Sequence, residues 1–391
     1  MRKSTCLLIL ALLFMAGMVV GTTSYVWATE EKAAHVTIDQ VVSVQKYNRS
    51  IHVMAMLMVG FGFLMVFVKK YGRSAVTATY LLVSIAVPMY IYINGRGYLG
   101  EPKSDVDGLL LAEFAAASLL ICAGAPLGRL KMSQYLLLAL LFTPCYMINE
   151  WILLESGLGL IPHGGFVDTG GSILIHAFGA IFGLGVIMTM TTKEEFAVPV
   201  EADHTSDQFS MLGSMVLWLF WPSFCAGLVE PKAVPFTAVN VFMALCGATI
   251  ATYFVSSTLR GKIAIGDVAN AALAGGVGVG ATCDTASHQT AFIIGILAGA
   301  LSTIGFVAIQ PALQNKVRGI DTCGVTNLHG WPGLMGGIAA AFLVPGIVPA
   351  NQFKGIIIAI ILALVTGYVT GQVLAYFGRR RTPYVDEEEF L

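Results

Sequence analysis

Long apolar segments alternate with short polar or Gly/Pro-rich connections along almost the whole chain. Cutting the sequence at these connections leaves eleven apolar segments, each close to the roughly 20 residues that a helix needs to cross a bilayer. They extend over residues 50–68, 75–94, 108–127, 133–153, 168–190, 206–229, 236–258, 264–282, 288–310, 321–343 and 353–377. The pattern predicts an all-α polytopic membrane protein with eleven transmembrane helices.

Composition agrees with a membrane protein. Hydrophobic residues make up 56% of the 391 residues and charged residues 12%, with a mean hydropathy of +0.78, whereas ordinary soluble domains have roughly 25% charged residues. The balance of 22 basic and 23 acidic residues gives no electrostatic reason to expect a nucleic-acid partner. No GxxxxGK[ST] sequence occurs, so ATP-driven transport by this chain is not expected.

The first 28 residues have the parts of a secretory signal peptide. Arg2 and Lys3 precede an apolar run over residues 6–20, and Val26-Trp27-Ala28 stands in place of a small-residue cleavage site. We expect cleavage after Ala28, which leaves the mature N terminus outside. The alternative is an uncleaved first transmembrane helix, because tryptophan is an unusual neighbour of a cleavage site.

Lysine and arginine residues are distributed unevenly over the connections. Thirteen fall on one side of the membrane and seven on the other. Because basic residues favour the cytoplasmic side, the N terminus is expected outside and the C terminus inside a cell inner (plasma) membrane. The transmembrane channel domain is then 29–378, and residues 379–391 are a cytoplasmic tail that we expect to be a solvated extension.

One nine-residue frame occurs twice. Asp168 begins DTGGSILIH and Asp321 begins DTCGVTNLH, 153 positions apart. The copies lie on the fifth and tenth segments, and an interval of five crossings reverses the chain direction. This predicts an inverted repeat of helices 1–5 and 6–10 around a central pore. Each histidine lies about 12 Å deeper than its aspartate at 1.5 Å per residue, so both reach the region of the midplane.

His176 and His329, which end the two frames, are the first candidate functional residues. A single histidine in a membrane span is more often a helix-contact residue. Two imidazoles that meet at the pseudo-twofold axis can instead share a hydrogen bond, which fixes their tautomers and leaves nitrogen atoms facing an apolar lumen. Burial favours the neutral imidazole, so the pair can bind a small neutral solute without placing a cation there.

Two acidic and two aromatic residues extend the candidate site. Asp168 and Asp321 begin helices, where a carboxylate caps backbone N–H groups and suits the helix dipole. Asp168 faces the outer side and could also stabilise an arriving cation. Phe114, near the outer start of the third segment, and Phe224, near the outer end of the sixth, fall at similar depth. They are either packing residues or an apolar constriction that blocks hydrated ions.

The chain resembles the ammonium transporter and Rhesus glycoprotein family over nearly its whole mature length, and is more similar to the Rhesus branch, as a bacterial-type Rh protein with a signal peptide. The matching segments, in family order, are HVMAMLMVGFGFLM (52–65), AEFAAASLLI (112–121), NEWILL (149–154), DTGGSILIHAFGA (168–180), WPSF (221–224), NAALAGGV (270–277) and DTCGVTNLHGWPGLMGG (321–337). By this resemblance, His176 and His329 match the twin pore histidines of the family, and Phe114 and Phe224 match its outer phenylalanine gate.

The resemblance also assigns residues that the pattern alone does not. Asp168 matches the outer-site acid, Ser172 lies on the same helix face four residues later, and Glu150 matches a vestibule carboxylate of the Rhesus branch. The family implies a homotrimer with one pore per protomer and no cofactor. Segment 156–167 is longer than is usual in the family, which affects the outer loop and the placement of Glu150.

The sequence therefore predicts a passive channel that receives ammonium outside, removes its proton and passes ammonia along the histidine-lined pore. A carbon dioxide channel of the same fold is the alternative. An intramembrane metalloenzyme is remote, because an Asp and a His two helical turns apart cannot bind one metal and no HExxH occurs. A sensor without flux would usually have a signalling domain. We expect neither enzymatic activity nor a metal site.

The first testable prediction concerns topology. Because basic residues are in excess on one side, a reporter fused after Arg381 should be cytoplasmic, and N-terminal sequencing of the mature protein should begin at Thr29. An external C terminus would contradict the antiparallel placement of the two frames.

Overall fold

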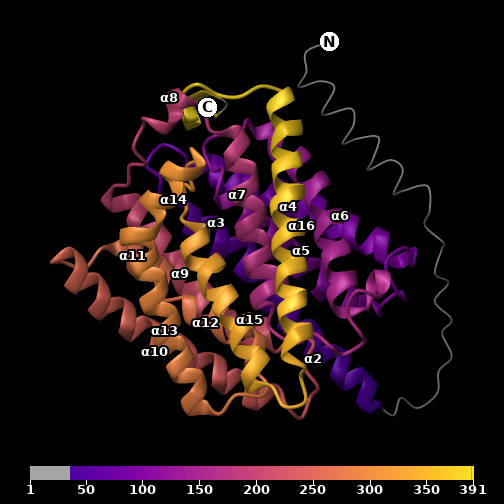
Figure 1. Cartoon of the computed structure of the whole chain (residues 1–391). Helices are drawn as coiled ribbons and strands as arrows, with labels where there is room; N and C mark the ends of the chain where they lie inside the picture. The colour runs from indigo at the N-terminus through magenta and orange to yellow at the C-terminus, as the bar shows by residue number, and fades with distance from the viewer. Residues whose placement is uncertain (1–35, 389) are drawn as a thin grey trace.

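The computed structural model describes residues 36–388 and 390–391, so the predicted signal peptide (1–28) lies outside the described residues. All regular elements in these ranges are helices, and they form one bundle (Figure 1). Helix α16 (Pro349–Tyr376) runs the height of the bundle. The first turn of α2 (Ile38–Ala55) lies at one end, and the C terminus lies at the other.

Eight helical stretches of the described chain are long and apolar enough to cross a membrane. They are Ile38–Phe67 (α2, with η1 Met56–Phe61, α3 Gly62–Leu64 and η2 Met65–Phe67), α4 (Gly72–Gly95), α5 (Asp105–Gly124), α6 (Met132–Leu154), Ser172–Met190 (η4 Ser172–Ala177 and α7 Phe178–Met190), α10 (Val234–Arg260), His288–Val317 (α13 His288–Ile304, η6 Gly305–Ile309 and α14 Gln310–Val317) and α16.

The other expected segments are also helical but do not reach that length and apolarity. They are α9 (His204–Cys225), the broken stretch α11 (Ile265–Ala271), α12 (Ala274–Val279) and η5 (Gly280–Thr282), and η7 (Thr326–Gly330) with α15 (Trp331–Leu343). Short helical turns are η3 (Gly157–Gly159), α8 (Lys193–Phe196) and η8 (Asp386–Glu388). All eleven expected segments thus fall on helices, while eleven membrane crossings stay a prediction.

Two expected boundaries differ from the structure for local reasons. The first helix begins at Ile38 rather than at residue 50, because Thr37 and Gln40 form a capping box. This polar first part of the helix gave no hydropathy signal. The eighth segment is not one helix but is interrupted at Ala272 and Leu273, where the chain turns between α11 and α12.

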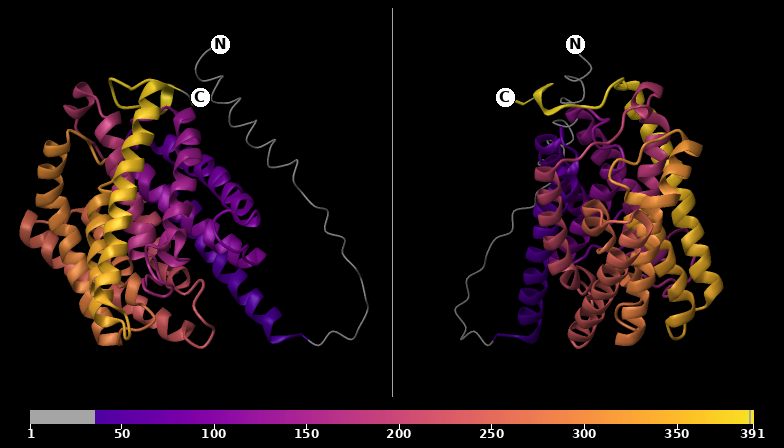
Figure 2. Two further views of the ribbon diagram at one scale, coloured as in Figure 1. Left: turned by 45° about the vertical axis from the view of Figure 1, so that its right-hand side comes forward. Right: turned by 90° about the vertical axis from the view of Figure 1, so that its left-hand side faces the viewer.

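Small residues set the distance between helices inside the bundle. A methyl group added at Gly295 of α13 would lie 2.0 Å from the carbonyl oxygen of Ala244 on α10, and one at Gly367 of α16 would lie 2.3 Å from the carbonyl oxygen of Phe182 on α7. At both glycines the backbone of one helix lies directly against the backbone of the other. A side chain at either position would therefore force the two helices apart. The turned views show the first helical stretch and α16 on different sides of the bundle (Figure 2).

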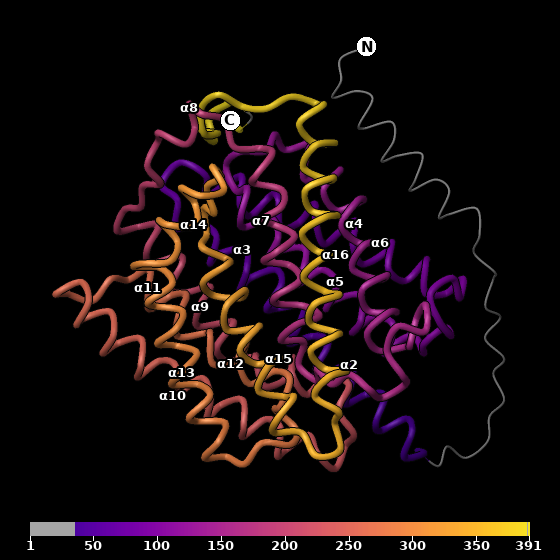
Figure 3. The backbone as a smooth tube through the Cα atoms, in the orientation of Figure 1, coloured from indigo at the N-terminus to yellow at the C-terminus, as the bar shows by residue number. Residues whose placement is uncertain are grey.

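The C-terminal tail is docked, which corrects the expectation of a solvated extension. Tyr384 is buried, and its backbone N–H donates to the carbonyl of Gly128 at 2.8 Å. Asp386 caps the first turn of α4: its carboxylate accepts from the N–H groups of Arg73 (2.8 Å) and Ser74 (2.9 Å) and from the Ser74 hydroxyl (2.5 Å). The tail therefore crosses the end of the bundle to the region of α8 (Figure 3). Its charges are used in contacts that sequence pattern does not reveal.

Asp386→Ala should release the tail from α4. Loss of a helix-capping carboxylate lowers stability by about 0.5–2 kcal/mol, so backbone amides at the start of α4 should exchange faster with solvent in hydrogen-exchange measurements. Glu387→Ala removes the same charge from an exposed neighbour and serves as the control. Equal exchange in both variants would contradict the capping role.

Candidate functional site

The two copies of the nine-residue frame fold in the same way. In each, the fourth residue is a glycine with positive φ, Gly171 at +75° and Gly324 at +64°, which a residue with a side chain rarely adopts. A π-helical turn follows in each, η4 and η7. The aspartate caps this turn. Asp168 Oδ2 accepts from the N–H groups of residues 173 and 174, at 2.9 and 2.7 Å.

Asp321 caps the second copy more completely. Its Oδ1 accepts from the N–H of Val325 at 3.0 Å and its Oδ2 from that of Thr326 at 2.9 Å. Oδ1 of Asp168, in contrast, is buried and has no hydrogen-bond partner among the described residues. Both aspartates are thus helix caps, as the sequence allowed, but only Asp168 has a carboxylate oxygen without a hydrogen-bond partner among the described residues.

Each frame is fixed by backbone hydrogen bonds to a segment of the other half of the chain. The N–H of Gly170 donates to the carbonyl of Gly280 in η5 at 2.8 Å, and the N–H of Cys323 donates to the carbonyl of Gly124 in α5 at 3.2 Å. Gly170 and Cys323 occupy the same position in the two frames. This reciprocal exchange is the contact pattern that an inverted repeat produces.

The exchange brings the two histidines into contact. Nδ1 of His176 lies 3.2 Å from Nδ1 of His329, and the rings are nearly parallel, with an interplanar angle of 8° and centroids 5.2 Å apart. Both side chains are 2% exposed, so the contact lies in the interior. One Nδ1 must donate and the other accept, which makes the two neutral tautomers different. The pair therefore presents one Nε2 acceptor and one Nε2–H donor.

Aromatic rings continue from the histidine pair in both directions. The rings of Phe114 and Phe224 lie 4.8 Å apart, and Phe224 lies 5.9 Å from the His176 ring. On the other side, Phe61 lies 6.1 Å from the His329 ring. We call these five residues the aromatic column. The structure thus brings together all four residues that the sequence assigned to the pore and its gate.

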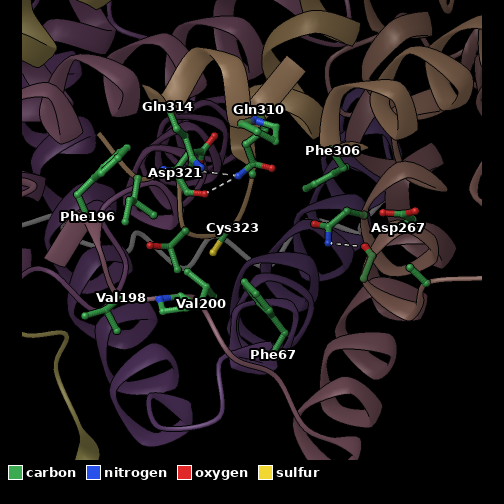
Figure 4. Close-up of a pocket in the computed structure, with 18 of the residues that line it drawn as sticks. Phe67, Phe196, Val198, Val200, Asp267, Phe306, Gln310, Gln314, Asp321 and Cys323 are labelled. Atoms are coloured by element: carbon green, nitrogen blue, oxygen red, sulfur yellow. Dashed lines mark hydrogen bonds between the residues drawn. The ribbon is translucent and has the colours of Figure 1, made fainter. Parts of the chain in front are cut away.

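Cavities lie toward the α14 end of the column. A small cavity of about 20 Å³ is lined by apolar residues together with Phe61 and His329. It shares Phe67, Asn270 and Cys323 with a larger cavity of about 620 Å³, which we call the inner cavity. Around Asp321 in this cavity, Gln314 accepts from the Asp321 N–H and Gln310 donates to its carbonyl, both at 2.8 Å (Figure 4). The small cavity beside Phe61 and His329 therefore adjoins a wider cavity whose lining has both apolar and polar residues.

A third cavity, of about 560 Å³, lies at Asp168 and is called the outer cavity. Its lining includes Leu228 and Val229, a few residues after Phe224. A methyl group on the neighbouring Gly227 would lie 2.9 Å from the Phe114 ring, so this segment passes directly beside the two phenylalanines. The aromatic column is thus flanked by one cavity at each frame.

The resemblance assigned Glu150 to the outer vestibule and Ser172 to the outer site beside Asp168, and the structure places both in contacts between helices. The Ser172 hydroxyl donates to the carbonyl of Val277 at 2.7 Å and accepts from the N–H of Ala281 at 2.8 Å, so this fully buried side chain joins the two halves. Glu150 lies in the α4–α6 contact, where the Tyr90 hydroxyl donates to its Oε2 at 2.5 Å. Neither residue is among the described residues that line the outer cavity.

Two residues of the site were not singled out from the sequence. Phe61 is part of the aromatic column, and Trp221 stacks on His176 with ring centroids 5.5 Å apart. Within the described part of the chain, Nε1 of Trp221 and Nε2 of His176 are both buried without a hydrogen-bond partner. The segments 52–65 and WPSF carried these residues, but hydropathy does not show which aromatic ring of a span faces inward. No group of three or more His, Cys, Asp or Glu residues that could hold a metal occurs among the described residues.

The chain is similar to known proteins over most of its length. The sequence model of the Ammonium Transporter Family matches residues 6–387. The chain is 35% identical over 349 residues to the ammonium transporter Rh type C of Rattus norvegicus, covering 84% of this chain and 69% of the relative. It is 38% identical over 308 residues to the ammonium transporter Rh type B of Homo sapiens, covering 76% and 66%.

Solved structures of the same family also match the fold of this chain. The structure described as Nitrosomonas europaea Rh50, a member of the Rhesus protein family of channels, matches with a TM-score of 0.88 and 52% identity, covering 90% of this chain and 93% of that chain. A sensor Amt protein matches with a TM-score of 0.75 at 18% identity, covering 89% and 95%. At that identity the second match shows the fold alone.

Proposed function

The chain belongs to the ammonium transporter family as an Rh-type, multi-pass membrane transporter, and from this premise we propose that it conducts ammonia passively along the aromatic column. The observation that carries the proposal is the contact between His176 and His329 at 3.2 Å, within the aromatic column and beside the small cavity that Phe61 and His329 line. The protein is a transporter rather than an enzyme, because its family is a transporter family.

The proposed mechanism separates a cation from a neutral solute. Ammonium arrives at the outer cavity, where the carboxylate of Asp168 in the lining supplies a negative charge. Phe114 and Phe224 close the passage to a hydrated ion, because the column offers few replacements for its water ligands. Ammonium therefore transfers its proton to water on the outer side and continues as ammonia.

The histidine pair suits ammonia once the proton has gone. Ammonia can donate to the Nε2 acceptor of one ring and accept from the Nε2–H of the other. Burial of both neutral rings disfavours a positive charge in the column, so the interior does not stabilise an ammonium ion that keeps its proton. Trp221 adds a further unpaired N–H next to His176.

The same premise supports the finer assignments of location and assembly. We place the protein in the inner (plasma) membrane as a homotrimer, with a cleaved signal peptide, the N terminus outside and residues 379–391 in the cytoplasm. The ends of the described chain lie at opposite ends of the bundle, as an odd number of crossings requires (Figure 1). Cross-linking of the purified protein would test the trimer.

Carbon dioxide remains the alternative solute, because an apolar column does not exclude a small neutral gas. The relatives are named as ammonium transporters, and the donor and acceptor on the histidine pair match ammonia better than an apolar gas. Liposomes that contain the protein should therefore pass ammonia faster than protein-free liposomes, with a much smaller change for carbon dioxide. Equal enhancement of both gases would argue against a role of the histidines in selection.

Substitution of the two histidines should separate their chemistry from simple packing. Replacing one ring by an apolar side chain leaves a nitrogen of the other ring without a hydrogen-bond partner. This lowers the stability of the fold by about 1–3 kcal/mol. His176→Glu or His329→Asp places a carboxylate in the column and should allow a net current of small cations, whereas leucine at both positions should stop ammonia. Ammonia flux and current in liposomes measure this. Unchanged flux without current in every variant would show that the histidines are structural.

Phe224→Ala should widen the outer end of the aromatic column. The variant should admit small hydrated cations or methylammonium that the wild type excludes, although loss of a buried ring also lowers stability by about 3–5 kcal/mol. Phe142→Ala is the matched control, because Phe142 is fully buried among Tyr146, Phe178 and Phe182, outside the column. If both folded variants keep wild-type selectivity, Phe224 is only a packing residue.

A further inference from the structure

Helix α16 lies at the surface of the bundle (Figure 2) and presents an apolar stripe on its exposed side. Four aliphatic side chains at intervals of four residues, each more than half exposed, form the stripe: Ile357, Ile361, Val365 and Val369. Tyr376, which is 73% exposed, ends the helix. Tyrosine is enriched where a membrane meets water. The stripe and this tyrosine therefore indicate that α16 faces lipid, with its C-terminal end at the level of the headgroups.

Three arginines follow directly after this helix end, and the tail uses only the middle one. Arg380 forms an ion pair with Glu388 at 2.5 Å, and its guanidinium carbon lies 4.8 Å from the centroid of the Tyr384 ring. Its side chain is 12% exposed. Arg379 and Arg381 are exposed, and neither forms an ion pair with a residue of 36–388 or 390–391. Two positive charges thus remain unused beside the end of a lipid-facing helix.

A third cation is fixed at the same corner. The Nζ of Lys131, at the start of α6, donates to the carbonyl of Phe377 at 3.4 Å, and a methyl group on Gly378 would lie 3.1 Å from it. The Gln134 side chain donates to the carbonyl of Gly378 at 3.0 Å. The backbone that leads into Arg379 is therefore held by α6. Such a fixed placement favours binding, because little ordering is needed when a ligand arrives.

We propose that Lys131, Arg379 and Arg381 bind the phosphate of an anionic phospholipid in the leaflet on the C-terminal side, which we call the α16 lipid site. The phosphate oxygens accept from the ammonium and the two guanidinium groups. The acyl chains lie along the apolar stripe of α16. The site takes no part in the passage of ammonia along the aromatic column.

The ligand class follows from the neighbourhood of the charges. Tyr376, at the end of the apolar stripe, precedes Arg379 by only three residues, so one molecule with a phosphate and an acyl chain can use both features. Basic residues directly beside a membrane helix are typical of sites for anionic lipids, and guanidinium groups match phosphate in geometry. The acidic residues of the tail lie further along the chain, after it has crossed the end of the bundle (Figure 1). They leave the charge of this corner positive.

Affinity for lipid tests the proposal in the purified full-length protein. In native mass spectrometry, Arg379→Gln and Arg381→Gln should each bind phosphatidylglycerol about fivefold more weakly, and the double variant about twentyfold to thirtyfold. Phosphatidylcholine should bind equally to all of them. Lysine at both positions should keep most of the affinity for phosphatidylglycerol. The control Lys262→Gln with Lys316→Gln removes two exposed basic charges elsewhere and should change little.

A local measurement distinguishes a lipid from a free anion. Phosphatidylglycerol nanodiscs, compared with phosphatidylcholine nanodiscs, should slow hydrogen exchange in residues 377–383 of the wild type and raise its melting temperature, because a ligand that binds only the folded state stabilises it. The double glutamine variant should show neither effect, while melting in phosphatidylcholine confirms that it is folded.

Two outcomes would overturn the α16 lipid site. Inorganic phosphate, added to protein in phosphatidylcholine at the same ionic strength as a chloride control, should leave exchange in residues 377–383 unchanged. Equal protection by phosphate would show a site for a free oxyanion instead of a lipid. If the folded double variant binds phosphatidylglycerol as tightly as the wild type, the three cations do not form a site.

Discussion

The contact between His176 and His329 is the interaction on which the rest of the site depends, because two polar rings are buried in an apolar interior. Each ring can be buried only if its partner satisfies one of its nitrogens. The backbone must therefore deliver both rings to the same depth from opposite directions. The glycine with positive φ, the capping aspartate and the π-helical turn perform this in both frames. A shift of one helix along its axis would separate the rings.

That precision comes from contacts between the two halves rather than within either. Each frame donates a backbone hydrogen bond to a carbonyl of the opposite half, at Gly280 and Gly124, and Ser172 adds two hydrogen bonds to residues 277 and 281. Neither half can complete its frame alone. Lateral packing, set by glycines against backbone carbonyls, fixes the helices around these junctions. The pore is thus a property of the interface between the repeats.

The sequence predicted the elements whose signals are local or periodic. Apolar runs located the helices, and the repeated frame located Asp168, Asp321 and the histidine pair. It could not locate contacts that depend on which face of a helix turns inward, so Trp221 and Phe61 went unassigned. Hydropathy also missed the docked tail, because charged residues such as Asp386 are normally solvated and only the geometry reveals its place on α4.

The two ends of the column are unequal in a way that a symmetric repeat does not require. Asp168 and Asp321 occupy the same place in their frames, yet only Asp168 keeps an unpaired oxygen. In a passive conduit this difference cannot set the direction of net flow, because a binding site at one end changes rates in both directions equally at equilibrium. It instead sets the solute concentration at which the outer end becomes occupied.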